Sequence, residues 1–404
     1  MKIRAITVFA DVGPPLDEAQ LARLGEFVRA ASQLYIDGGF DVQTTRLATR
    51  VFPRLHLADW ADRPVEFVVS LEQMCRRHGF DYLSVGPAER DVWDRLPDVL
   101  AATESVFATI NINSRATDTI DGAAVRGAAR VIRQTATVEA DGFANLRFAA
   151  LANVAPGTPF FPAAYYGGGP PSFAIATEAA DLALAACTGA RDAEAACWRL
   201  VSAIEKQANR LARRASRLAQ EHDIYFGGID FSPAPFPSPE TSIGAAIESL
   251  SGHPLGSTGS LAAAAVLTDA LDRAQFPRCG FCGLMLPLLE DTVLASRAAE
   301  GRLRIGDLLQ WSALCGTGLD TVPLPGDVSE ESLAALLFDV AALATRLKKP
   351  LSARLMPLPG KVAGDEVKFD FAYFTDSRVL PLDEEMTSGL LTRTAELRLR
   401  PRSR

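Results

Sequence analysis

The chain has 404 residues, of which 48% are hydrophobic and 22% charged, and its formal net charge is −8. These values are typical of a globular protein with a sizeable core. The basic face that a nucleic-acid-binding protein needs is lacking. No run of about 18 apolar residues is present to cross a membrane. We therefore expect neither a nucleic-acid partner nor a membrane partner.

The two ends of the sequence carry separate signals. Residues 1–9 alternate in polarity like a β-strand and do not resemble a signal peptide, which predicts a cytoplasmic protein. The last residues contain Arg398, Arg400, Arg402 and Arg404, and we interpret 385–404 as a solvated, disordered tail.

Short apolar runs alternate with segments of helical periodicity along the chain. Strands are expected at 3–10, 40–46, 80–85, 105–111 and 145–153, and then at 224–230, 281–288, 318–323, 350–356 and 368–374. Helices are expected at 16–38, 64–78, 89–101, 119–139, 240–250, 257–275, 303–314 and 329–347, with a long helical insert at 176–222. The helix at 329–347 is the best signalled, because Ser329 can cap it, Glu330 and Glu331 follow, and Pro350 stops it.

This order of elements predicts an α/β protein with mostly parallel strands and outer helices. We expect one domain, 1–384, in which ten strands form two five-stranded halves at about 1–153 and 224–376. In a closed barrel the site lies in the loops after the carboxyl ends of the strands. We therefore expect the polar residues that follow these strands to gather at one edge of one sheet.

Cys315 is the first candidate for a reactive group. It stands between a predicted helix and a loop broken by Gly316 and Gly318, which allow the backbone a positive φ. We predict that this loop presents the thiol to an interior cavity as a nucleophile or acid–base group, with Asp230 or Asp320 as its proton partner. No histidine is close in the sequence, so activation would depend on arginines or backbone N–H groups.

Several residues at strand ends are candidates for binding an anionic substrate. A guanidinium grips a carboxylate or phosphate through paired hydrogen bonds, so the clamp is predicted from arginine and lysine. The alternative of equal weight is that the same cations form structural ion pairs with Asp230, Glu290, Asp291 and Asp320. The predicted substrate-binding residues are Arg46, Asn111, Asn153, Tyr165, Tyr166, Arg354 and Lys361.

The same carboxylates suggest a second kind of site. Asp230, Glu290 and Asp291 offer the oxygen ligands that Mg²⁺ or Ca²⁺ prefers, whereas Glu290 and Asp291 could equally cap a following helix. Cys279 and Cys282 form the one C-x-x-C pair, but no second ligand pair accompanies them, and they are interpreted as core residues. The glycine run at 167–169 matches no nucleotide-binding motif.

Several segments of the chain resemble a known family, the uncharacterised protein family 0210, also called domain of unknown function 711. The resemblance extends from Ile3 to Asp365. Its most specific motifs are Pro159-Phe160-Phe161-Pro162-Ala163-Ala164-Tyr165, Gly228-Ile229-Asp230, Gly283-Leu284-Met285-Leu286-Pro287, Cys315-Gly316-Thr317-Gly318-Leu319-Asp320 and Ala353-Arg354-Leu355-Met356-Pro357.

The resemblance implies the fold group of pyruvate formate-lyase and ribonucleotide reductases, which is a ten-stranded α/β barrel. In that group a loop carries a cysteine through the barrel centre, and Cys315 would be its counterpart. The glycyl-radical motif is lacking, because no glycine follows Gly389. The resemblance thus implies no glycyl radical and names no reaction or cofactor.

Three functional hypotheses follow. The leading one is an enzyme that acts on a small anionic metabolite with the loop cysteine. The second is a lyase or hydrolase assisted by a divalent cation. The third is a non-catalytic metabolite sensor, and for all three the sequence leaves open whether the chain forms a homo-oligomer.

Overall fold

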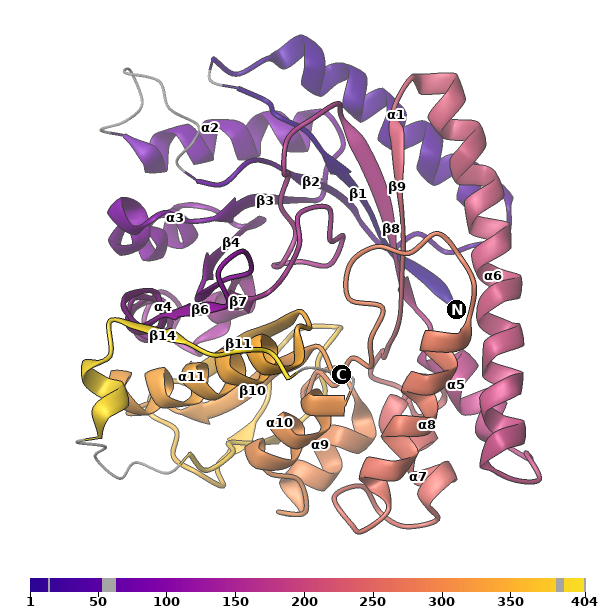
Figure 1. Ribbon diagram of the computed structural model, residues 1–404. Coiled ribbons are helices and arrows are strands. Elements are labelled where there is room, and N and C mark those ends of the chain that lie inside the picture. The colour runs from indigo at the N-terminus through magenta and orange to yellow at the C-terminus, as the bar shows by residue number, and fades with distance from the viewer. Residues whose placement is uncertain (14, 53–62, 315, 383–388, 403–404) are drawn as a thin grey trace.

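The computed structural model describes residues 1–13, 15–52, 63–314, 316–382 and 389–402. Its main feature is one nine-stranded sheet that helices surround (Figure 1). The strands, in their order across this sheet, are β10 (Gly318–Pro325), β11 (Leu351–Leu358), β7 (Phe148–Ala152), β4 (Val106–Asn111), β3 (Tyr82–Pro87), β2 (Thr45–Ala48), β1 (Lys2–Phe9), β8 (Ser172–Glu178) and β9 (Tyr225–Ala234).

The strand directions divide the sheet into blocks. Strands β1, β2, β3, β4 and β7 are parallel to one another, as are β8 with β9 and β10 with β11. The blocks meet antiparallel where β1 pairs with β8 and where β7 pairs with β11. The amino ends of the first block therefore lie beside the carboxyl ends of the others, so the expectation that all carboxyl ends share one edge is wrong.

The α/β class is confirmed, whereas the strand list needs correction. Strand β8 falls partly in the segment predicted as a helical insert, and residues 368–374 form no strand. Segment 281–288 is not a strand of the ladder either, but it contacts both end strands. Isolated bridges join Ile229 to Arg278, Leu284 to Gly316, and Pro287 to Asp320. In the described ranges the continuous ladder is thus open between β9 and β10.

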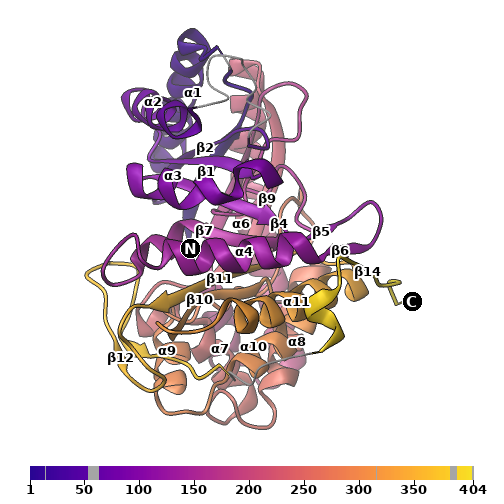
Figure 2. The ribbon, with the colours of Figure 1, turned by 90° about the vertical axis from the view of Figure 1, so that its left-hand side faces the viewer.

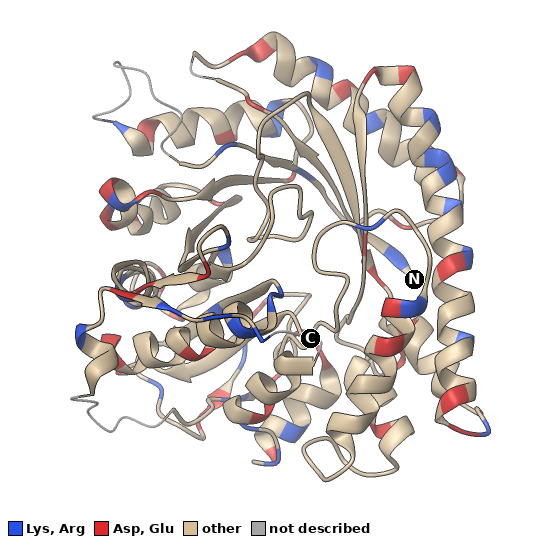
Figure 3. Ribbon diagram, viewed as in Figure 1, with Lys and Arg blue, Asp and Glu red and all other residues tan. Residues whose placement is uncertain are grey.

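The helices cover the outer face of the sheet. They are α1 (Glu18–Asp37), α2 (Pro64–Arg77), α3 (Leu96–Ala102), α4 (Gly122–Thr135), α5 (Ala180–Cys187), α6 (Ala193–His222), α7 (Ile243–Ser251), α8 (Ser260–Arg273), α9 (Thr292–Ala299), α10 (Ile305–Leu314) and α11 (Glu330–Leu347). Figure 2 shows α3, α4 and α11 in front of the sheet. The main core fills the space between helices and strands. Charges of both signs are interspersed on these helices (Figure 3).

The C-terminal segment is docked, not loose. Strand β14 (Glu396–Arg398) pairs antiparallel with β6 (Thr119–Asp121), and the backbone N–H of Arg402 donates to the Arg346 carbonyl at 2.9 Å. The prediction of a disordered tail is therefore wrong where β14 pairs with β6, because this pairing satisfies backbone groups of residues 396–398. Among the described residues, no helix combines the length and apolarity needed to cross a membrane.

Candidate active site

A cavity of about 80 Å³ opens on the inner face of the sheet, between the amino ends of the first block and segments 281–290 and 371–373. Because a water molecule needs about 10–15 Å³ of such space, the cavity has room for a small molecule. Its polar lining residues are Arg4, Gln43, Thr44, Arg46, Tyr82, Glu290, Thr317, Asp320, Ser352, Arg354 and Tyr373.

A loop that follows β7 gives the cavity its apolar wall. Thr7 Oγ1 donates to the Pro159 carbonyl at 2.8 Å, and Ser84 Oγ donates to the Ala164 carbonyl at 2.6 Å. These bonds hold the loop against the inner face of β1 and β3. Phe161 is thereby packed beside Phe107 and lines the cavity.

One side of the cavity is a network of ion pairs. Arg354 Nε lies 2.5 Å from Asp320 Oδ1, and its Nη2 lies 3.0 Å from Glu290 Oε1. Arg4 pairs with the other oxygen of Glu290 and lies 3.3 Å from Glu178. Burial lowers the pKa of Arg4 and of Arg354, but the neighbouring carboxylates outweigh it and raise both. This part of the alternative reading, structural ion pairing, is correct for Arg354.

Arg46 stands apart from that network. Its side chain is 6% exposed and its Nε donates to Thr44 Oγ1 at 2.9 Å, but it forms no ion pair with any described residue. Its guanidinium carbon lies 5.0 Å from the ring centre of Phe161 and 5.5 Å from that of Tyr82. Burial, and then repulsion by Arg4, lower the pKa of Arg46 to about 9, so it stays cationic at neutral pH. A buried charge without a partner costs several kcal/mol, and an anion would remove that cost.

A bulge in β10 presents Asp320 to the same cavity. The register with β11 shifts between Leu319 and Val322, and Thr321 has a φ of 45°. A left-handed conformation is strained for a β-branched residue. Thr321 Oγ1 accepts a hydrogen bond from the Leu289 N–H at 3.2 Å, which holds the bulge. Burial raises the pKa of Asp320, although Arg354 lowers it.

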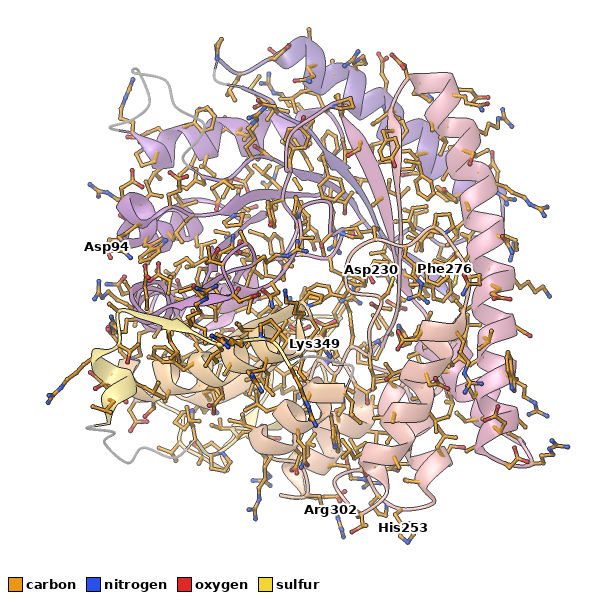
Figure 4. All side chains as sticks on the ribbon, in the orientation of Figure 1. Asp94, Asp230, His253, Phe276, Arg302 and Lys349 are labelled. Carbon is orange, nitrogen blue, oxygen red and sulfur yellow. The ribbon has the colours of Figure 1, made fainter. Side chains whose placement is uncertain are left out.

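Asp230 was predicted as a proton partner and a metal ligand, and it lies outside the cavity lining. Its carboxylate accepts hydrogen bonds from Ser232 Oγ at 2.6 Å, Phe281 N at 2.6 Å and Cys282 N at 2.9 Å. Burial raises the pKa of Asp230 to about 6. Figure 4 shows Asp230 inside the molecule. Its bonds tie β9 to the segment after Arg278, which is a structural role.

Asp291 likewise accepts hydrogen bonds from backbone N–H groups. Its Oδ1 accepts from Val293 N at 2.9 Å and Leu294 N at 3.0 Å at the start of α9, and its Oδ2 accepts from Ile243 N at 2.6 Å at the start of α7. Of the three predicted metal ligands, only Glu290 lines the cavity. Within the described ranges no cluster of three or more His, Cys, Asp or Glu side chains is placed to hold a metal ion.

The predicted polar residues at the carboxyl ends of β4 and β7 lie away from the cavity. Asn111 is exposed. Asn153 accepts from Asn113 Nδ2 at 2.9 Å and donates to the Ala344 carbonyl at 2.6 Å. The prediction that Asn111 and Asn153 line the site is wrong in position, because the cavity lies at the opposite, amino ends of these strands.

Three further predicted contacts are also absent from the cavity lining. Tyr165 donates to the Val154 carbonyl at 2.9 Å, and Tyr166 donates to the Gly169 carbonyl. Both hydroxyls thus stabilise their own loop. Lys361 is exposed beyond the end of β11.

The cysteines divide into two cases. Cys315 lies outside the described residues, but Thr317, two positions later, lines the cavity and donates its N–H to the Leu284 carbonyl at 3.2 Å. Burial raises the pKa of Cys282 to about 12 and that of Cys279 well above its ordinary value. Both thiols are therefore protonated at neutral pH, and the thiolate is the reactive form.

The sequence reasoning missed some residues of the site. Arg4 and Tyr373 line the cavity, and Arg4 Cζ lies 5.5 Å from the Tyr373 ring centre. Arg4 is one of the polar positions of the alternating strand at 1–9, but nothing in the sequence showed that this strand would line a cavity. Tyr373 stood in an aromatic run that was interpreted as a strand, so its packing could not be anticipated.

These features define an α/β protein with a mixed sheet and a small, charged internal cavity. Over residues 1–376 the chain matches the family described as Uncharacterised ACR (DUF711), and it belongs to that family. It is 33% identical over 324 residues to the UPF0210 protein of Pyrobaculum arsenaticum, covering 76% of this chain and 70% of that relative. It is 31% identical over 367 residues to the UPF0210 protein of Pyrobaculum islandicum, covering 86% and 80%.

Proposed function

We propose that this protein is an enzyme that binds a small anionic metabolite in the inner cavity, with Arg46 as the anion-binding residue. The observation that supports it is the buried Arg46 cation, which has aromatic neighbours and a threonine but forms no ion pair with a carboxylate among the described residues. An anion at the terminal nitrogens of Arg46 would supply the direct ion pair that this side chain lacks.

The catalytic roles are proposed from the same cavity. Asp320 would move a proton, because one of its oxygens is held by Arg354 and burial favours its protonated form. Cys315 would act as the nucleophile or as a second acid–base group, which is an inference from its sequence position before Thr317. Arg354 and Arg4 would hold Asp320 and Glu290 in place and would not grip substrate. No glycyl radical takes part in this proposal.

We also infer that the sheet closes into a ten-stranded barrel of the pyruvate formate-lyase type. Two parallel blocks that meet antiparallel at β1–β8 and β7–β11 support this reading. Segment 278–288 is the tenth element, since it bridges β9 at Ile229, β10 at Asp320 and, just before β10, Gly316. The Leu288 N–H donates to the Asp320 carbonyl at 3.0 Å, which adds a ladder-like bond.

The test is anion binding by the purified protein. Calorimetric titration with short carboxylates, phosphate and sulfonates should identify at least one anion that binds wild type. Arg46→Met should abolish that binding. Arg217→Met is the matched control, because it removes the same charge from an exposed pair on α6 and should bind as wild type does. Failure of every anion to bind wild type would overturn the proposal.

The sensor hypothesis is separated by a second measurement. Small molecules released from the native protein by denaturation can be identified by mass spectrometry and offered back as substrates. If Cys315→Ala and Asp320→Asn retain the affinity of wild type and wild type converts nothing, the protein binds its metabolite without catalysis. Loss of turnover in either variant with retained binding would support the enzyme.

A further inference from the structure

We propose that the ligand of this cavity is a small monocarboxylate carrying a hydroxyl or ammonium group next to its carboxylate. Arg46 would hold the carboxylate, and Asp320 would accept a hydrogen bond from the neighbouring donor. This inference rests on the proposed function and narrows its substrate class.

The free nitrogens of Arg46 define the first half of the ligand. Its Nε is engaged by Thr44 Oγ1, whereas its two terminal nitrogens have no hydrogen-bond partner among the described residues. Two parallel N–H groups on a planar guanidinium match the two oxygens of a carboxylate. The two terminal nitrogens of Arg46 therefore form the carboxylate subsite.

Charge favours a monoanion over a phosphate. The other two cavity arginines are already paired, Arg4 with Glu178 and Glu290, and Arg354 with Glu290 and Asp320. These two arginines share three carboxylates, so with Arg46 the cluster holds three cations and three anions, and a monoanion adds the least further negative charge. A phosphate monoester carries about −1.5 to −2 at pH 7, so it would leave excess negative charge beside Glu290 and Asp320.

Asp320 defines the second half of the ligand. Arg354 binds its Oδ1, and its Oδ2 has no hydrogen-bond partner in the described part of the chain. The strained bulge at Thr321 keeps this carboxylate at the cavity, which it lines together with Arg46. In its ionised form the Asp320 carboxylate only accepts hydrogen bonds, so the ligand group that meets this form is an O–H or N–H donor.

The size and the walls of the cavity limit the rest of the ligand. About 80 Å³ holds a handful of water-sized groups. Phe107, Phe161 and Phe281 contribute apolar surface to the lining. The remainder of the ligand is therefore short and apolar.

The experiment compares three ligands of matched size by calorimetric titration at neutral pH: propionate, lactate and alanine. Wild type should bind lactate or alanine at least about tenfold more tightly than propionate, because a hydrogen bond to a charged group is worth about 1.5–3 kcal/mol. Whichever of the two binds more tightly tells whether the donor is a hydroxyl or an ammonium. Methyl phosphate is the fourth probe and should bind more weakly than the preferred carboxylate.

Two variants separate the halves of the site. Asp320→Ala should bring the ratio of lactate or alanine affinity to propionate affinity close to one, and Asp320→Leu, which also lacks an acceptor, serves if the alanine variant fails to fold. Arg46→Met should lower the affinity for all three carboxylates by a similar factor. Equal affinity of wild type for all three carboxylates overturns the donor inference and leaves the proposed function standing, as does tighter binding of methyl phosphate. Binding of no anion overturns both.

Discussion

Each side of the cavity contains a buried arginine, and the two arginines have different partners. On the side of β10 and β11, Arg354 has two carboxylate partners within 3.0 Å. On the side of β2 and β3, Arg46 has aromatic rings and one threonine. Both arginines are buried, at 7% and 6% exposed. Burial alone therefore does not distinguish the two arginines, whereas the pairing of their charges does.

The largest difference between the two sides should appear on removal of Arg354. Arg354→Met leaves Glu290 and Asp320 with less positive charge beside them in a buried site. Breaking a buried ion pair in this way costs about 3–5 kcal/mol. Urea unfolding should show this loss, and a loss below about 1 kcal/mol would mean that solvent screens the pair.

The next prediction concerns the strained bulge at Thr321, which presents Asp320 to the cavity. Thr321→Ala keeps a side chain at a left-handed φ, whereas Thr321→Gly relieves it, so the glycine variant should be the more stable by about 1–2 kcal/mol. The neighbouring strand provides the control. Ala353→Gly in β11 should lose about 0.5–1 kcal/mol, the usual cost of glycine in a strand. If Thr321→Gly is the less stable variant, the bulge holds no strain.

Removal of Arg46 should have a smaller effect on stability. Arg46→Met loses one hydrogen bond and the ring contacts but also removes an unpaired buried charge. We expect the free energy of unfolding to fall by no more than about 1 kcal/mol, or to rise. The same urea experiment measures it. A loss as large as that of Arg354→Met would show that Arg46 is paired, and the comparison of the two sides would fail.

The smallest effect is a pH dependence carried by Asp320. Because its pKa is raised in the folded state, the folded protein keeps this proton longer than the unfolded chain does. Its contribution to stability is thus full below the ordinary pKa of aspartate and is lost as pH rises through the folded value. The difference in unfolding free energy between wild type and Asp320→Asn should therefore decline with rising pH. A difference that grows with pH would mean that Arg354 dominates and lowers this pKa.

The local chemistry of the sequence was enough to predict several elements. The predicted helix at 329–347 is α11, and Ser329 Oγ accepts from Ser332 N at 3.0 Å as an N-cap should. The importance of Arg46, Arg354 and Asp320 was also predicted, and all three line one cavity. Capping, periodicity and residue type act over a few neighbouring positions, so they can be read without knowledge of the fold.

The interaction partners of each charged group could not be predicted in the same way. Asp230, Asp291 and Asp320 look equivalent in the sequence, yet the first two bind backbone N–H groups and only the third faces the cavity. Asn111 and Asn153 were placed wrongly because the relative direction of strands far apart in the chain was unknown.

The sequence by itself determined the α/β class, the family and the residue types from which a site could be built. Only the tertiary structure decided that β1 pairs antiparallel with β8, which brings Arg4 beside Glu178 and sets the cavity at the amino ends of the first block. The reason is physical. Local propensity depends on neighbours in the chain, whereas the pairing of a buried charge depends on which distant strand lies a few ångströms away. That leaves Arg354 paired and Arg46 without an ion pair among the described residues.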